Sequence, residues 1–289
     1  MKYAYYPGCS LQSTAMGYDL SLREVCLKLG IELVEVPGWI CCGSTAAHST
    51  SHLLALALPI KNLQLVQKTG IKEMVVPCAA CFSRFKFALD QCEKEPELKK
   101  QVEHILDEPF PQGISVLHPL EIFSRPEMLG QINQQIKNHT PELKLVCYYG
   151  CLLTRPPKVT KFDQCENPTS MDKILSTAGF FPQDWSYKTD CCGASLVFTE
   201  TELSLKLIDK LITQAKLLDA EAIALACTLC HTNLDTRQKD LKKISGNDYH
   251  LPILFFTQLL GLGFGIEPKK LGLKKHLTST EPVLKKFNR

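Results

Sequence analysis

Ten of the fourteen cysteines form one five-cysteine pattern that occurs twice along the chain. Each copy has a lone cysteine, an adjacent Cys-Cys pair followed by glycine, and a C-x-x-C pair. The first set is Cys9, Cys41, Cys42, Cys78 and Cys81, and the second set is Cys151, Cys191, Cys192, Cys227 and Cys230. Corresponding members lie 142, 150, 150, 149 and 149 positions apart. This offset indicates a duplicated unit with an insertion of about eight residues after Cys151.

Thiolates in this arrangement are ligands for soft metals, above all for iron–sulfur clusters. A C-x-x-C pair alone fits zinc or a redox dithiol equally well, but the side chains of an adjacent Cys-Cys pair diverge and rarely serve one four-coordinate zinc. An ordinary cubane 4Fe–4S cluster takes four cysteines, whereas each set has five. Either one cysteine per set is spare or the cluster is not an ordinary cubane, and the same surplus in both sets favours the second interpretation. We therefore expect all ten cysteines to be metal ligands.

The rest of the composition is that of a globular protein. The chain has 289 residues, of which 45% are hydrophobic and 22% are charged, and this length predicts about two domains. The repeat divides the chain into residues 1–142 and 143–289. The N-terminus has no apolar leader segment, so we expect a cytoplasmic protein whose cysteines serve metal or redox chemistry rather than disulfides.

Charge and hydropathy narrow the range of partners. Residues 269–289 carry a net charge of +6 and the remainder −3, which predicts a solvated tail or a docking surface for an acidic partner. Aromatic residues are not interleaved with these basic residues, so nucleic-acid binding is not expected. The longest apolar run, residues 251–264, is too short to span a bilayer and predicts a buried or interfacial helix.

Each half is expected to repeat one order of elements: a strand before the lone cysteine, a helix that ends at glycine, a second strand before Cys-Cys-Gly, a helix, and a buried strand that runs into C-x-x-C. The expected segments are 2–6, 20–29, 31–36, 53–67 and 73–76 in the first half, and 143–149, 170–178, an irregular stretch with Pro182, 200–218 and 222–225 in the second. The alternation predicts an α/β fold of two repeated βαβ-type halves. The metal sites are then expected at the carboxyl ends of the strands.

Several local features refine this expectation. Pro59 is expected to kink or restart the helix 53–67, and the helix 200–218 is expected to bury Leu203, Leu207, Leu211 and Ile212 along one face. Residues 93–105 and 118–124 are expected to be helical, and residues 109–141 are expected to connect the halves. The glycine-rich segment 261–265 lacks a dinucleotide fingerprint and predicts a helix end. With no nucleotide motif, electrons are expected to come from, or go to, another subunit.

Other residues are weaker candidates. His231 follows Cys230 and is either a residue that orients a sulfide or donates a proton, or a surface histidine. Arg155 and Lys158 lie just beyond Cys151 and are candidates for binding an anionic substrate, the alternative being solvated loop charges. His48 is a weaker candidate still, and His118 is expected to be structural. The four cysteines outside the pattern have no repeat partner. Cys26 and Cys147 are expected to be buried thiols. Cys92 is expected on a polar helix and Cys165 in a loop.

Seven short segments together resemble one known family. They are YYPGC at 5–9, CCG at 41–43, PCAAC at 77–81, YYGCLLTRP at 148–156, CCGA at 191–194, CTLCH at 227–231 and TQLLGL at 257–262. They closely resemble the catalytic B subunit of heterodisulfide reductase, and the resemblance covers nearly the whole chain. It implies two noncubane 4Fe–4S clusters, each bound by the five cysteines of one set, and a substrate disulfide between them, so that the ten cysteines and His231 would form the catalytic site. It also implies a C subunit with ordinary clusters as electron donor, and a complex that includes a flavin-containing A subunit.

The doubled site suits such a reaction, because a disulfide takes two electrons whereas a cluster passes one at a time. The hypothesis is that each cluster captures one sulfur and delivers one electron, so that neither half releases a thiyl radical. The substrate is the mixed disulfide of coenzymes M and B, or another disulfide, a persulfide or a protein-bound sulfur. Two other functions stay open: an electron-transfer subunit such as those of glycolate- or lactate-oxidising complexes, and a structural protein with two zinc sites.

Overall fold

A computed structural model describes residues 1–44, 47–136 and 140–287. In these residues, eight strands form two four-stranded parallel sheets with the orders β2-β1-β3-β4 and β6-β5-β7-β8. The two orders are identical apart from a shift of four, so the repeat inferred from the cysteines is a repeat of the fold, and the α/β prediction is confirmed. The strands are β1 (Lys2–Tyr5), β2 (Glu32–Glu35), β3 (Glu73–Val75), β4 (Ser115–Leu117), β5 (Lys144–Tyr148), β6 (Phe181–Gln183), β7 (Ala222–Leu225) and β8 (Ile253–Phe255).

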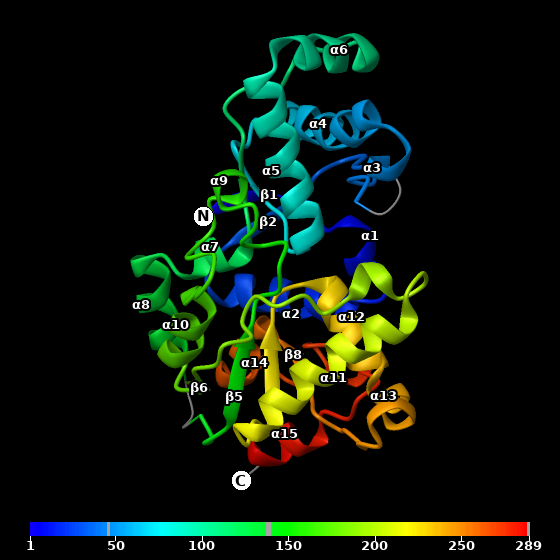
Figure 1. The fold of residues 1–289 in the computed structure, drawn as a ribbon. Helices are drawn as coiled ribbons and strands as arrows, with labels where there is room; N and C mark the ends of the chain where they lie inside the picture. Colours follow the sequence, from blue (N-terminus) through cyan, green and yellow to red (C-terminus); the bar gives the residue numbers. More distant parts are fainter. Residues whose placement is uncertain (45–46, 137–139, 288–289) are drawn as a thin grey trace.

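Helices connect the strands and cover the sheets (Figure 1). They are α1 (Gly8–Leu11), α2 (Met16–Lys28), α3 (Ala47–Thr50), α4 (His52–Lys68), α5 (Ala79–Lys94), α6 (Pro96–Leu106), α7 (Pro119–Phe123), α8 (Pro126–Gln135), α9 (Pro157–Thr160), α10 (Ser170–Thr177), α11 (Thr201–Leu217), α12 (Thr228–Thr236), α13 (Gln238–Ser245), α14 (Phe256–Gly263) and α15 (Glu281–Phe287). Within the described parts of the chain, none of these helices is long and apolar enough to cross a bilayer.

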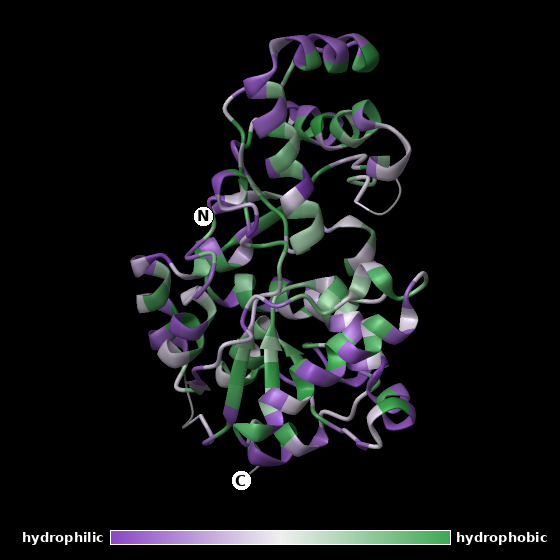
Figure 2. Ribbon diagram, in the orientation of Figure 1, coloured by the Kyte–Doolittle hydropathy of each residue, from purple (hydrophilic) through white to green (hydrophobic). Residues whose placement is uncertain are grey.

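The central strands are short, apolar and buried on both faces. Every residue of β7 is buried, and so are the last four residues of β5. Continuous apolar strands are typical of parallel sheets, because helices cover both sides. Figure 2 shows strands of the second sheet mainly in hydrophobic colours, while the outer helices also carry hydrophilic ones. The partly exposed β6 contains Pro182 and lies at the edge of its sheet, where a residue without an N–H is tolerated.

The two halves pack against each other through helices from both. Helix α2 of the first half packs on α14 of the second, and α10 of the second half packs on α7 and α8 of the first. Figure 1 shows α2, in blue, near α14, in orange. The contact between α2 and the second half is close, because a Cβ at Gly272 would lie 2.8 Å from Cα of Gly17 and the Ser21 hydroxyl lies 2.6 Å from that of Thr257. The fold therefore fixes the position of one half relative to the other.

Two strands lie where the sequence predicted other structures. The apolar run 251–264 is not a single helix, because Ile253–Phe255 forms β8 and only then does α14 begin. The Gln258 side chain accepts the Phe255 backbone N–H at 3.0 Å and so supports this junction. Likewise Ser115–Leu117 forms β4 inside the expected connection 109–141, part of which, residues 137–139, lies outside the described residues. Each of these strands covers an edge of its sheet that would otherwise leave backbone groups unpaired.

Three helix predictions also need correction. The expected helix 93–105 is divided, because Pro96 has no N–H and restricts the preceding residue, so α5 ends at Lys94 and α6 begins at Pro96. Conversely, α4 continues through Pro59 without a restart, since buried side chains on both sides of the proline hold the helix against the core. In α11 the buried face is Ile208, Leu211, Ile212 and Ala215, whereas Leu203 is 47% exposed.

Candidate metal centre

The lone cysteine of each set follows a glycine that makes room for another sulfur of the same set. Gly8 and Gly150, which precede Cys9 and Cys151, have φ values of +67° and +71°. A Cβ on Gly8 would lie 3.3 Å from Sγ of Cys81, and a Cβ on Gly150 would lie 2.9 Å from Sγ of Cys230. Only glycine meets both the backbone conformation and the space requirement. At each strand end the backbone just before the lone cysteine therefore lies against the last cysteine of the same set.

The adjacent Cys-Cys pairs complete the two clusters of sulfur atoms. In the first half, Sγ of Cys42 lies 3.0 Å from Sγ of Cys81, and in the second half Sγ of Cys192 lies 3.5 Å from Sγ of Cys230. The other member of each pair accepts the backbone N–H of the following glycine residue, at 3.4 Å in the first half and 3.3 Å in the second. All fourteen cysteines, each of them within the described residues, are free thiols. The structure thus brings together the sulfurs that the spacing predicted.

Each set has a buried floor and an accessible side. Three cysteines per set are buried, and the other two are exposed or partly exposed. The buried ones are Cys42, Cys78, Cys81, Cys192, Cys227 and Cys230, and the accessible ones are Cys9, Cys41, Cys151 and Cys191. The same division in both halves describes two sites that are held inside the protein but open on one side. An open side is what a metal centre needs in order to meet a substrate.

Hydrogen bonds between neighbouring thiols favour the thiolate form of one cysteine and the protonated form of its partner. Hydrogen bonds from Cys41 and then Cys81 lower the pKa of Cys42 to about 4, and a hydrogen bond from Cys151 lowers the pKa of Cys191 to about 6. Hydrogen bonds with Cys42 and Cys78, together with burial, raise the pKa of Cys81. Thiolates are the form of cysteine that binds metals. The donor set and the room left by glycine therefore fit a bound cluster.

The two sets meet at their C-x-x-C loops. The Thr228 hydroxyl, from the second half, donates a hydrogen bond to Sγ of Cys78, from the first half, over 3.1 Å. His118 lies beside this contact, and its Nε2 is 2.9 Å from the Pro77 carbonyl and 3.3 Å from the Ala226 carbonyl. These carbonyls belong to the residues just before the first cysteine of each C-x-x-C. His118, which the sequence marks as structural, joins the two loops.

The two halves carry the same histidine–phenylalanine pair with the positions exchanged. Phe82 and His231 are equivalent, since each follows the last cysteine of its set, and the strand registers make His118 and Phe255 equivalent. Phe82 contacts His118 edge-on with ring centroids 5.9 Å apart, whereas His231 stacks on Phe255 at 4.2 Å. His231 is 4% exposed, so the alternative that it is a surface histidine is wrong.

His231 ends a chain of hydrogen bonds that begins at Gln258. The Gln258 amide is held in one orientation, because its Oε1 accepts one backbone N–H and its Nε2 donates to a backbone carbonyl. Its Nε2 lies 2.8 Å from Nε2 of His276, so that ring nitrogen accepts. The proton of His276 is then on Nδ1, 3.0 Å from Nε2 of His231. Burial lowers the pKa of both histidines, which is consistent with two neutral rings.

This arrangement argues against a metal ion at the three residues His231, Asp235 and His276, whose ligand atoms lie within 4.8 Å of one another. A metal on Nδ1 of His276 would force its proton onto Nε2, which faces the donor amide of Gln258. The Asp235 carboxylate already accepts two backbone N–H groups, at 2.8 and 3.0 Å. These residues therefore form a hydrogen-bonded support, and they position His231. The sequence signal for the support is the segment 257–262, which the family resemblance includes.

The charged candidates near Cys151 have different surroundings. Arg155 forms an ion pair with Glu166 at 2.8 Å and donates two hydrogen bonds to Thr189, which lies two residues before Cys191. Its position therefore braces the loop that carries the second Cys-Cys pair. Lys158 is exposed on α9, and His48 is exposed on α3.

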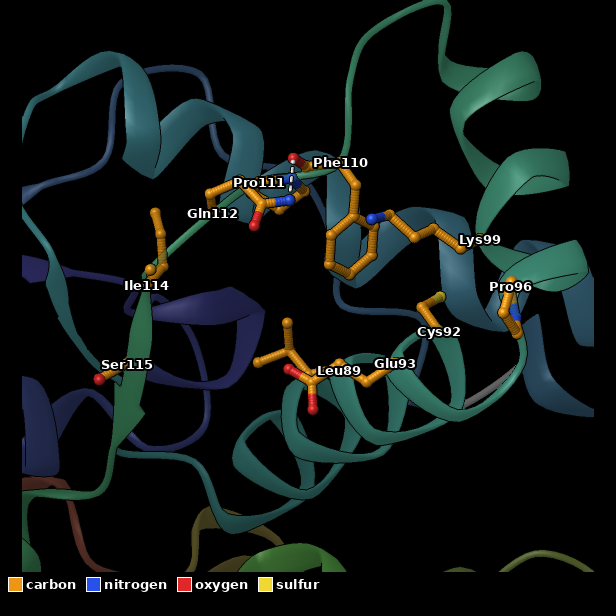
Figure 3. A pocket seen from close by; sticks show the side chains of 11 residues that line it. Leu89, Cys92, Glu93, Pro96, Lys99, Phe110, Pro111, Gln112, Ile114 and Ser115 are labelled. Carbon is orange, nitrogen blue, oxygen red and sulfur yellow. Dashed lines mark hydrogen bonds between the residues drawn. The ribbon is translucent and has the colours of Figure 1, made fainter.

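A cavity of about 500 Å³ lies elsewhere, between α5, α6 and β4 (Figure 3). Cys92 lines this cavity together with Lys99 and Phe110, whose ring faces the lysine ammonium at 5.0 Å. Burial raises the pKa of Cys92 to about 11 and that of Cys26 to about 12. Cys26 and Cys147 are buried, as expected for structural thiols. None of the ten repeated cysteines lines the cavity, so it is separate from the two candidate metal sites.

Comparison with known proteins identifies the repeated unit. Residues 3–86 and 145–235 each match the cysteine-rich CCG domain, and together these stretches make up more than half of the chain. The chain belongs to the CCG domain family. Each match contains one complete set of five cysteines. The family and the sulfur donor set together support iron–sulfur clusters as the groups bound at the two sites.

Several relatives match over nearly their full length. The 8-methylmenaquinol:fumarate reductase membrane anchor subunit of Wolinella succinogenes is 29% identical over 96% of this chain and 96% of its own. The B subunit of the ferredoxin/F(420)H(2)-dependent CoB-CoM heterodisulfide reductase of Methanosarcina acetivorans is 26% identical over 99% of this chain and 97% of its own. A protein of Archaeoglobus profundus that is named as similar to the heterodisulfide reductase B subunit is 24% identical over 94% and 93%. The resemblance to the B subunit of heterodisulfide reductase is thereby confirmed.

The fold itself also occurs in a solved structure. A hypothetical protein from Helicobacter pylori superposes with a TM-score of 0.71 over 96% of this chain and 52% of that chain. The two sequences are 14% identical, so this likeness concerns the fold alone.

Proposed function

We propose that the chain is the catalytic subunit of a heterodisulfide reductase or of a similar complex, and that it cleaves or forms a disulfide or related sulfur bond at two noncubane 4Fe–4S clusters. The observation that carries this proposal is the pair of equal five-cysteine sites whose C-x-x-C loops touch through Thr228 and Cys78. Each site has its own accessible cysteines, as a two-centre reaction on one substrate requires. The relatives from Methanosarcina acetivorans and Archaeoglobus profundus support the assignment, because both are named after heterodisulfide reductase, an oxidoreductase.

The reaction balances with two electrons and two protons. The disulfide R–S–S–R′ takes up both electrons, its S–S bond breaks, and two protons complete the thiols RSH and R′SH; the reverse reaction forms the bond. When bound, each cluster supplies one electron at a time. The chain's own residues hold the clusters, and the exposed Lys158 attracts an anionic substrate toward the open side of the second site. Arg155 fixes the loop there, and His231, held by His276, orients a sulfur group.

The electrons come from a partner subunit. We propose a C-type subunit with ordinary 4Fe–4S clusters as the donor, and a flavin-containing A-type subunit in the same complex. Support comes from relatives that are named as subunits of reductases, and from the absence of a nucleotide motif in this sequence. The large number of free thiols supports a reducing compartment, and we propose the cytoplasm.

Anaerobic purification with the partner subunits, followed by iron and sulfide analysis, tests the proposal. Two four-iron clusters give about eight irons per chain. Cys192→Ser should lower this count by about half and abolish two-electron turnover while the signal of the first site persists. Cys92→Ser is the matched control, because this cysteine is buried outside both sets, and the iron count should not change. Normal turnover after the loss of one cluster would refute the two-centre reaction.

A second function is favoured by one specific observation. The relative from Wolinella succinogenes is named as the membrane anchor subunit of an 8-methylmenaquinol:fumarate reductase, and this name mentions no disulfide. In this alternative, the chain passes electrons between other subunits and has no sulfur substrate of its own. The two functions differ in their response to thiols. A paramagnetic signal that changes when a thiol is added under oxidising conditions supports the first function, and a signal that no thiol changes supports the second.

A further inference from the structure

The two metal sites differ at one position in their contacting loops. Thr228 follows Cys227 in the second C-x-x-C, and the equivalent residue of the first, 149 positions earlier, is Ala79. Thr228 is fully buried and donates its hydroxyl hydrogen to Sγ of Cys78 over 3.1 Å. The Ala79 methyl group has no hydrogen to donate. Within the described residues, no side chain of the first half donates a hydrogen bond to Sγ of Cys227 in return.

The position of the Thr228 hydroxyl is set by the fold. Thr228 is the first residue of α12, and this helix packs on α1 and α5 of the first half. His118 ties the residues that precede both C-x-x-C pairs, so neither loop can move away from the other without breaking a buried hydrogen bond. A β-branched side chain also has few χ1 rotamers available. The packing of the two loops therefore holds the Thr228 hydroxyl beside Sγ of Cys78.

We propose that Thr228 makes the two sites unequal, so that the first site accepts an electron before the second. This inference rests on the proposed iron–sulfur function. Reduction adds negative charge to a cluster and its thiolate ligands, and a hydrogen bond to a ligand sulfur stabilises that charge. The first electron from the partner subunit then goes to the first site and the next one to the second. Both electrons leave together in the cleavage of one S–S bond.

The other contacts to the sulfurs are matched between the sites or act in the same direction. A side-chain hydrogen bond from Tyr6 lowers the pKa of Cys42 in the first site, and one from Asn233 lowers the pKa of Cys192 in the second, so this pair does not distinguish the sites. The backbone N–H bonds to Cys41 and Cys191 have nearly equal lengths of 3.4 and 3.3 Å, so they do not distinguish the sites. Asp190 precedes Cys191, whereas the uncharged Ile40 precedes Cys41. The Asp190 carboxylate opposes further negative charge on the second site, although Lys210, at 3.1 Å, neutralises part of its effect.

Redox titration of the intact complex, followed by paramagnetic resonance, tests the inference. Thr228→Val removes the hydroxyl and keeps the shape, Thr228→Ala reproduces the residue of the first half, and Thr228→Ser keeps the hydroxyl as a control. The Val and Ala variants should shift the electron-exchange equilibrium between the sites by about tenfold toward the second site, which corresponds to about 59 mV for a one-electron couple. The Ser variant should stay close to the wild type, with unchanged iron content in all three.

Single-site backgrounds assign the effect. With Cys192→Ser, which removes the second cluster, Thr228→Val should still lower the potential of the remaining signal. With Cys81→Ser, which removes the first cluster, Thr228→Val should have no effect. Unchanged potentials in fully iron-loaded Val and Ala variants would overturn the inference and leave the proposed function intact. A purified complex with no iron signal at either site would overturn the proposed function itself.

Discussion

The replacement His118→Gln tests whether an uncharged imidazole joins the two cysteine loops. Nδ1 of His118 accepts the Leu120 backbone N–H at 3.2 Å, so the ring proton is on Nε2, which donates to the carbonyls of Pro77 and Ala226. The residue is fully buried, and burial lowers its pKa from the ordinary value of 6.5 to about 4. A protonated ring would have to give up the bond that Leu120 makes with Nδ1. Glutamine retains an amide donor but does not titrate.

The pKa difference sets the sign and size of the effect on stability. In the unfolded chain His118 takes up a proton near pH 6.5, whereas in the folded chain it stays neutral down to about pH 4. Between these values the unfolded state binds more protons, so the free energy of unfolding falls as the pH falls through this window. Integration from about pH 7.5 to about pH 5 gives a loss of about 2 kcal/mol that is due to His118 alone.

Urea unfolding of the wild type and of His118→Gln, at about pH 7.5 and about pH 5, measures this contribution. The glutamine variant should be less stable than the wild type at the higher pH, by about 1 kcal/mol, since one buried hydrogen bond to a loop is lost. Its stability should fall less on acidification, and the difference between the two pH dependences should be about 2 kcal/mol. Glu121, which caps α7 beside His118, is present in both proteins. Its titration therefore contributes equally to both pH dependences and does not affect their difference. Parallel pH dependences would refute a buried neutral imidazole.

Two further substitutions probe the surroundings of the sulfurs. Gly150→Ala should remove about half of the iron, because its new Cβ would lie 2.9 Å from Sγ of Cys230. Gly30→Ala is the control, since Gly30 has a similar φ of +65° and no atom lies within 4 Å of the new Cβ. For this control, iron analysis should show full loading, and urea unfolding should show a loss of stability of about 1 kcal/mol. Lys188→Met should lower stability by about 3 kcal/mol in thermal unfolding, because the nearly buried Lys188 lies 3.1 Å from Asp172, which would be left without its partner. Adding Asp172→Asn should recover most of that loss, and no recovery would contradict the ion-pair explanation.

The cysteine pattern predicted the repeat because ten residues of one type recur in the same order at a nearly constant offset. Strands such as β1 and β7 were predictable from runs of apolar residues that end at a cysteine. The three-residue strands β4 and β8 were not, since three residues show no periodicity and their pairing depends on β3 and β7. The prediction that Leu203 lies on the buried face of α11 was wrong, because the elements that pack against a helix determine which of its residues are buried.

The contact between the sites was also beyond prediction from the sequence. Thr228 and Cys78 lie 150 positions apart, and their hydrogen bond exists only because the two halves pack with their C-x-x-C loops together. His231 was found as a candidate by its place beside Cys230. Of its supports, Gln258 lies in the segment 257–262 that the family resemblance includes, whereas His276 gave no signal in the sequence. Interactions between elements distant in sequence follow from packing, which single-sequence patterns do not encode.

The insertion after Cys151 shows how the duplication was modified where the halves meet. It accounts for the shorter offset of the lone cysteines, 142 against 149 or 150, and the segment there forms α9, which packs on α5 of the first half. Helix α5 begins with the C-x-x-C of the first set. The second half therefore contacts this loop and its helix twice, through α9 and through Thr228. A strict repeat would give two equal sites. Here the second half contacts the first C-x-x-C loop and its helix through Thr228 and α9, and the proposed ordered delivery of two electrons rests on this inequality.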